Sequence, residues 1–146
     1  MGRDSILLIE DNPNDEELVV LALRDQAFPC ELVVARDGME GLEYLLSPAR
    51  RGSKSKNIPR LVLLDLKLPK MDGLAVLEKL RSEDRTRFVP IVIWSSSGET
   101  HDLQKAYELG ATSYVQKPVN FDEFSDAIHQ IAKYWLRLNR SVTSTV

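Results

Sequence analysis

Apolar residues in this chain gather in short continuous runs separated by longer mixed segments. Continuous runs at positions 6–9, 61–64 and 91–94 are accompanied by similar ones at 32–35 and 113–115. Runs that are apolar on both faces are what parallel strands need when helices cover both sides of their sheet. The pattern therefore predicts five buried strands.

Helical spacing of apolar residues follows each run. The expected helices cover residues 16–27, 38–46, 74–80, 100–109 and 121–138. Asn14 or Asp15 can cap the first helix and Thr100 the fourth, and Gly110 can end the fourth with a left-handed residue. Regular alternation of strand and helix predicts an α/β fold, in which helices cover both faces of a doubly wound, five-stranded parallel sheet.

Composition limits the class of protein. A chain of 146 residues suits one domain, and a net charge of −3 argues against nucleic acid as the main partner. Cys30 is the single cysteine and no apolar run is long enough for a signal peptide or a membrane span, so we expect a cytoplasmic protein that does not enter a membrane. Five basic residues without interleaved aromatics are interpreted as belonging to an exposed loop over 47–59 and its end. These are Arg50, Arg51, Lys54, Lys56 and Arg60.

Residues with chemical potential stand at the carboxyl ends of the expected strands. The first strand leads into Glu10 and Asp11, the third into Asp65, the fourth into Ser95, and Lys117 follows the fifth. Ligands of open parallel sheets bind at this edge. Three carboxylates meeting there repel one another unless a cation joins them, and such hard oxygen ligands suit Mg²⁺ or Mn²⁺. A lysine and a hydroxyl beside them suit an incoming phosphoryl group.

Each of these residues also has an ordinary interpretation. Acidic residues are common at exposed strand ends, Lys117 alone could be a surface lysine, and Ser95 alone could simply close a strand. Their joint occurrence at four strand ends favours a site.

Four motifs carry a resemblance to a known family. They read LLIED at 7–11, LLDLKLPKMDG at 63–73, SSS at 95–97 and YVQKP at 114–118. Together they resemble the receiver domain of bacterial two-component response regulators, over residues 5–138, with 139–146 as a loose tail. The resemblance implies a flavodoxin-like (βα)5 fold with strand order 2-1-3-4-5.

The resemblance also implies roles for the metal-binding residues. Asp11 would bind Mg²⁺ directly, Glu10 would reach it through water, and Asp65 and the backbone carbonyl of Lys67 would complete the protein ligands.

For phosphorylation, the resemblance implies that Asp65 accepts the phosphoryl group from the phosphohistidine of a sensor histidine kinase. Ser95 and Lys117 would contact the phosphoryl oxygens, and Tyr114 would be the switch residue that turns inward when Ser95 moves. The peptide bond between Lys117 and Pro118 would be cis. In this interpretation the protein is a signalling switch with slow autodephosphorylation and not an enzyme that turns over a substrate.

Within the family the chain is similar to the short regulators paired with cyanobacterial and other bacterial phytochromes. The segment 47–59, the turn at 12–15 and the end of the last helix carry this similarity. The kinase could equally be another sensor type. Because no output domain follows Leu138, output is expected through binding of a separate protein, either a target or a phosphotransfer protein.

The last helix suggests a self-association surface. Trp135, Leu136 and Leu138 exceed what one stripe packed on the sheet needs, so they are candidates for a homodimer contact. The family's surface for this is the fourth helix, the fifth strand and the fifth helix.

Two alternatives with a similar fold do not fit the strand ends. An aspartyl phosphatase needs a second Asp two residues after its nucleophile as general acid, but Lys67 follows Asp65 and Pro13 follows Asp11 at that distance. A flavodoxin-type cofactor binder needs a Ser-, Thr- and Gly-rich phosphate loop, whereas residues 11–15 are acidic. Lys67 is also a departure within the family, and we hypothesise that its side chain shields the phosphoryl group from water.

Overall fold

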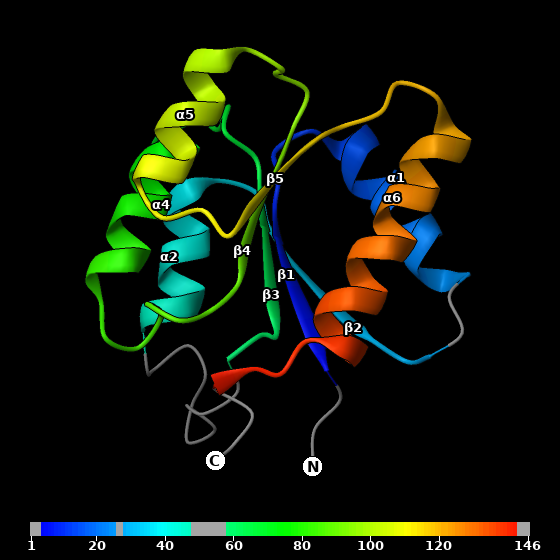
Figure 1. The fold of residues 1–146 in the computed structure, drawn as a ribbon, viewed down its shortest axis with the longest axis horizontal. Helices are drawn as coiled ribbons and strands as arrows, with labels where there is room; N and C mark the ends of the chain where they lie inside the picture. Colours follow the sequence, from blue (N-terminus) through cyan, green and yellow to red (C-terminus); the bar gives the residue numbers. More distant parts are fainter. Residues whose placement is uncertain (1–3, 26–27, 48–57, 143–146) are drawn as a thin grey trace.

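Five parallel strands form the centre of the protein (Figure 1). The computed structural model describes residues 4–25, 28–47 and 58–142. The strands are β1 (Ser5–Ile9), β2 (Glu31–Ala35), β3 (Leu61–Leu64), β4 (Ile91–Ser95) and β5 (Ser113–Gln116). They lie in the order β2-β1-β3-β4-β5 and every pair is parallel, which confirms the expected sheet.

Helices cover both faces of this sheet. They are α1 (Pro13–Arg24), α2 (Gly38–Leu46), α4 (Gly73–Ser82), α5 (Thr100–Glu108) and α6 (Phe121–Lys133), and α6 continues into the π-helical turn η1 (Tyr134–Leu138). Figure 1 shows α1 and α6 on one face and α2, α4 and α5 on the other. Each face has its own apolar core, and β1, β3 and β4 contribute to both, which is why their runs are continuously apolar.

Two helix starts differ from the sequence expectation. Helix α1 begins at Pro13, because the side chain of Asn12 accepts hydrogen bonds from the backbone N–H groups of Asn14 and Asp15. Asn12 is thus the cap, and the proline occupies the first helical position, where its missing N–H costs nothing. Helix α5 starts at Thr100 without a side-chain cap. The left-handed residue after α5 is Gly110, as expected, with φ of +107°.

The end of the last helix corrects one proposed dimer contact. Leu136 is only 2% exposed and belongs to the core, while Leu138 is 63% exposed and Trp135 is half-buried. The cause is η1, whose wider turn inserts one residue into the helical repeat. The apolar stripe of Phe124, Ile128 and Ile131 therefore continues through Leu136.

The opposite end of the sheet from the acidic residues is tied together by Arg81, near the end of α4. Its guanidinium donates to the carbonyls of Thr86, Arg87, Val89 and Gly110 and to the Thr112 hydroxyl, at 2.8–3.1 Å. Through this one side chain α4 is joined to the segments that lead into β4 and β5.

The described residues test two further expectations only in part. Of the basic residues near the 47–59 loop, Arg60 is described and pairs with Asp4 at 3.0 Å, whereas the other four lie outside the described residues. Among the helices that the structure describes, none has the length and apolar character needed to cross a membrane.

Candidate functional site

Backbone hydrogen bonds that continue the sheet hold the candidate residues at its carboxyl edge. The N–H of Glu10 donates to Ala35 O at 2.9 Å, that of Asp65 to Ile9 O at 3.1 Å, and that of Lys117 to Ser95 O at 2.7 Å. The positions of these side chains are thus set by the rigid centre of the fold.

A glycine keeps the segment after Asp65 close to the strand. The N–H of Gly73 donates to Leu66 O at 2.8 Å, and a Cβ at this position would collide with the carbonyl oxygen of Asp65. Helix α4 can begin this near to the site only because position 73 has no side chain.

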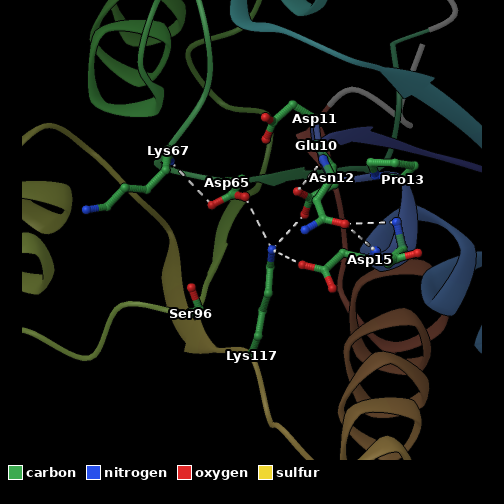
Figure 2. Close-up of a pocket in the computed structure, with 10 residues that line it drawn as sticks. Glu10, Asp11, Asn12, Pro13, Asp15, Asp65, Lys67, Ser96 and Lys117 are labelled. Atoms are coloured by element: carbon green, nitrogen blue, oxygen red, sulfur yellow. Dashed lines mark hydrogen bonds and ion pairs between the residues drawn. The ribbon is translucent and has the colours of Figure 1, made fainter.

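Lys117 is the centre of the site's polar contacts. Its Nζ donates to Glu10 Oε1 at 2.7 Å, to Asp15 Oδ2 at 2.8 Å and to Asp65 Oδ2 at 3.2 Å (Figure 2). Glu10, Asp65 and Lys117 are each less than 10% exposed. The sequence interpretation brought Glu10, Asp65 and Lys117 together correctly. It missed Asp15, because Asp15 lies in the first turn of α1 and not at the end of a strand.

The electrostatics of the site reflect an excess of negative charge. Burial raises the pKa of Glu10 to about 7, and the neighbouring charge of Asp65 also raises it, while Lys117 opposes the shift. Burial lowers the pKa of Lys117, but its hydrogen bonds to Asp15 and Glu10 outweigh this, so the pKa is raised above its usual value. Lys117 is therefore a permanent cation.

Three carboxylates stand close enough to share one metal ion. Ligand atoms of Glu10, Asp11 and Asp65 all lie within 4.8 Å of one another. Asp11 is exposed, and these residues line an open pocket together with Asn12, Lys67 and Ser96. The donor set consists of carboxylate oxygens and opens to solvent, which suits a hard divalent cation that keeps some of its waters.

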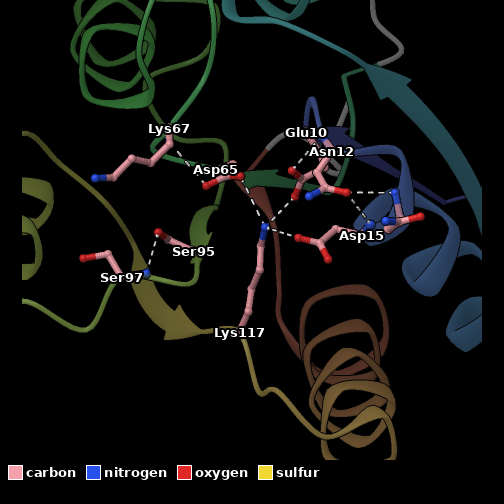
Figure 3. A network of polar contacts seen from close by, with 9 residues as sticks. Glu10, Asn12, Asp15, Asp65, Lys67, Ser95, Ser97 and Lys117 are labelled. Carbon is pink, nitrogen blue, oxygen red and sulfur yellow. Dashed lines mark hydrogen bonds and ion pairs between the residues drawn. The ribbon is translucent and has the colours of Figure 1, made fainter.

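The residues on the β4 side of the site form a separate set of hydrogen bonds. Ser95 is fully buried, and its Oγ accepts a hydrogen bond from the N–H of Ser97 at 3.1 Å (Figure 3). The Ser97 hydroxyl donates to Asp102 at 2.6 Å, and the Tyr114 hydroxyl donates to the Ser97 carbonyl at 2.9 Å. Tyr114 is thereby linked to the segment that carries Ser95.

Lys67 contributes its backbone and not its side chain. Its N–H lies 3.4 Å from Asp65 Oδ1, and Figure 2 shows the side chain extending away from the carboxylates. Shielding of a phosphoryl group by this side chain would need another rotamer, and its carbonyl as a metal ligand stays a prediction.

The peptide bond between Lys117 and Pro118 is not cis. No cis peptide bond occurs among the residues that the structure describes, so this implication of the resemblance is wrong. The trans isomer is the lower-energy form by about 0.5–1 kcal/mol, and Lys117 reaches all three carboxylates from it.

Comparison with known proteins agrees with this geometry. The family model described as the response regulator receiver domain matches residues 6–129. The probable methanogenesis regulatory protein FilR2 of Methanothrix harundinacea is 38% identical, over 93% of this chain and 86% of FilR2. Response regulator Rcp1 of Synechocystis sp. is 31% identical, over 90% of this chain and 88% of Rcp1.

Solved structures give the same result. The phosphorylated cyanobacterial phytochrome response regulator RcpA matches with a TM-score of 0.85 and 34% identity, over 97% of this chain and 99% of RcpA. The Mn²⁺-bound form of Rcp1 matches with a TM-score of 0.82 and 30% identity, over 94% and 98% of the two chains. The matches confirm the resemblance that the four sequence motifs carry.

Proposed function

The chain belongs to the response regulator receiver domain family, and on this premise we propose that it is a signalling switch whose phosphoryl acceptor is Asp65. The observation that best supports this assignment is the surroundings of the Asp65 carboxylate. It is 7% exposed at the end of β3, its Oδ2 lies 3.2 Å from Lys117 Nζ, and the carboxylates of Glu10 and Asp11 lie beside it. A carboxylate fixed next to a permanent cation is suited to attack phosphorus.

The transfer is a substitution at phosphorus. A carboxylate oxygen of Asp65 forms a bond to the phosphorus of a phosphohistidine while the P–N bond breaks, and its electron pair stays on the imidazole nitrogen of the kinase. Lys117 pairs with the transferred oxygens and offsets their charge. The phosphorylated product carries roughly two negative charges at a position that carried one.

Glu10, Asp11 and Asp65 would hold a divalent cation, Mg²⁺ or Mn²⁺, with the Lys67 carbonyl as a further ligand. The carboxylate donor set fits such an ion, as the mutual spacing of its oxygens indicates. When bound, the cation supplies positive charge that reduces repulsion between these carboxylates and an incoming phosphate. The Mn²⁺-bound structure of the relative Rcp1 supports this proposal.

Ser95 and Tyr114 would convert the new charge into a change of shape. The Ser95 hydroxyl, which now accepts from Ser97 N–H, would turn and donate to a phosphoryl oxygen. Because the Tyr114 hydroxyl is bonded to the Ser97 carbonyl, a movement of this segment reaches β5 and the adjoining α5 and α6. Contacts that exist only in the phosphorylated state shift a two-state equilibrium toward it.

Phosphotransfer from a labelled histidine kinase tests the proposal. Wild type should acquire the label and Asp65→Asn should not. Asp84→Asn is the control and should also acquire it, since the Asp84 side chain is fully exposed and does not line the pocket. Label on Asp65→Asn, or none on wild type with any kinase of the source organism, would contradict the assignment.

The cognate kinase is proposed to be a phytochrome-type histidine kinase acting in the cytoplasm. Support comes from the similarity to RcpA, described as a cyanobacterial phytochrome response regulator. Profiling transfer from all candidate kinases, in darkness and in red light, would decide it: light-dependent transfer from one photoreceptor kinase is the expected outcome, and preference for a kinase without a chromophore would refute it.

A homodimer through the α5, β5 and α6 surface is a further part of the proposal. Leu103 and Tyr107 of α5 expose apolar side chains on this surface. Leu138, beyond α6, is also exposed, and Trp135 near it is half-buried. Sedimentation at tens of micromolar should show a dimer whose population rises on phosphorylation. A monomer in both states would remove this part.

A further inference from the structure

Asp15 is bonded to the catalytic lysine although no motif assigns it a role. It lies in the first turn of α1, where its N–H donates to the capping Asn12 side chain at 3.2 Å. This places its carboxylate over the pocket, 2.8 Å from Lys117 Nζ and nearer to it than the carboxylate of Asp65 at 3.2 Å (Figures 2 and 3).

The charge of Asp15 is not part of the group that could hold a metal. Glu10, Asp11 and Asp65 have ligand atoms within 4.8 Å of one another, and Asp15 is not among them. With Glu10 and Asp65 holding a cation, Asp15 would be the partner that remains for Lys117. The same lysine must later pair with the phosphoryl group.

We propose that Asp15 is a positioning residue that holds Lys117 in the resting state and competes with the phosphoryl group for it. The inference rests on the proposed function. A phosphoryl oxygen that takes Lys117 leaves the Asp15 carboxylate unpaired beside a second anion, which raises the free energy of the phosphorylated state. A contact made in the resting state alone shifts the equilibrium toward that state. Asp15 thus sets how readily the switch turns on.

The ordinary alternative is that Asp15 serves only the helix. Acidic residues in a first turn stabilise the N-terminus through the helix dipole, and in that case its loss would lower stability without favouring any ligand. The two interpretations differ in the sign of their effect on ligand binding. Removing the competing carboxylate should strengthen the binding of a phosphoryl mimic and weaken the binding of a bare cation.

The test is calorimetric titration of Asp15→Asn, first with Mg²⁺ and then, at saturating Mg²⁺, with beryllofluoride as the phosphoryl mimic. We expect beryllofluoride to bind about three- to tenfold more tightly than to wild type and Mg²⁺ to bind a few-fold more weakly, as suits one partly exposed ion pair. Glu17→Gln is the matched control, since it removes an exposed charge from the same helix outside the pocket; both affinities should stay within about twofold.

Asp15→Glu, which keeps the carboxylate, should bind beryllofluoride more weakly than Asp15→Asn and so return toward wild type. Unchanged or weaker beryllofluoride binding in a folded Asp15→Asn would overturn the inference and leave the proposed function standing. A wild-type protein that binds Mg²⁺ but no beryllofluoride would overturn the proposed function itself.

Discussion

Two cations lie at opposite ends of the sheet, Lys117 buried and Arg81 half-buried, and they bind different kinds of oxygen. Arg81, at the amino ends of β4 and β5, donates to four backbone carbonyls and a hydroxyl. Lys117, at the carboxyl end of β5, donates to the carboxylates of Glu10, Asp15 and Asp65. Both tie distant segments together, yet only one end of the molecule is built to change.

The difference is one of charge balance. The partners of Arg81 are neutral, so its planar fork satisfies them and no other ligand is needed. At a pH above about 7, where Glu10 is ionised, the partners of Lys117 carry three negative charges against one positive charge, and the exposed Asp11 adds a fourth. This end therefore has an excess of negative charge that a divalent cation would reduce. Its lysine can also exchange one anionic partner for another.

The largest effect is expected from removing the guanidinium of Arg81 from its neutral oxygen partners. Arg81→Met should lower the free energy of unfolding by about 4 kcal/mol, because several partly buried carbonyls lose their donor at once. Urea denaturation measures this, with Lys79→Met, whose ion pair is exposed, as the control within about 0.5 kcal/mol. The loss should be the same with chelator and with Mg²⁺. A loss below 1 kcal/mol would show that water replaces the guanidinium easily.

The same kind of change at the other end should depend on metal. In chelator at mildly alkaline pH, Lys117→Met should lower the free energy of unfolding by about 3 kcal/mol, since Glu10 and Asp65 stay buried without a cation. Added Mg²⁺ should stabilise this variant more than it stabilises wild type, because the ion takes over the neutralisation. Equal stabilisation of both proteins by Mg²⁺ would contradict an excess of negative charge at this end of the sheet.

A smaller effect tests the packing around Arg81. Gly110 has a φ of +107°, and a Cβ there would lie 2.7 Å from Arg81 Cγ. Gly110→Ala should therefore lower the free energy of unfolding by about 1–2 kcal/mol, through backbone strain and displacement of the arginine. Thermal unfolding without loss of stability would mean that Arg81 can move without breaking its bonds.

The smallest expected effect has the opposite sign. In chelator, Asp65→Asn should raise the free energy of unfolding by about 1 kcal/mol, because it removes one of the mutually repelling charges around Glu10. This gain in stability should disappear in Mg²⁺, because the ion stabilises wild type more than it stabilises the variant. A loss of stability in chelator would show that the contact of Asp65 with Lys117 outweighs the repulsion.

The sequence predicts the framework of the sheet better than the contacts of Lys117. Leu61–Leu64 reads as a strand at once because both faces of β3 are buried, and the strand ends then bring Glu10, Asp65 and Lys117 to one edge. The cap at Asn12 was missed because capping depends on backbone geometry that Asn14 and Asp15 could equally have adopted.

Two other features could not be read from periodicity. The π-helical turn shifts the repeat by one residue, so Leu136, which was expected to be a dimer contact, enters the core. The hydrogen bond between Asp15 and Lys117 depends on how the first turn of α1 lies relative to the lysine that follows β5, a tertiary relation that no local pattern contains.

The central claim is that Asp65 accepts a phosphoryl group, and the direct measurement is to locate the acyl phosphate chemically. After incubation with acetyl phosphate and Mg²⁺, borohydride reduction converts a phosphorylated aspartate to homoserine, and peptide mass spectrometry identifies its position. The account predicts homoserine at position 65, dependent on Mg²⁺ and absent when chelator replaces the metal. Homoserine at Asp11 or Asp15 in its place, or no conversion with Mg²⁺ present, would contradict the account.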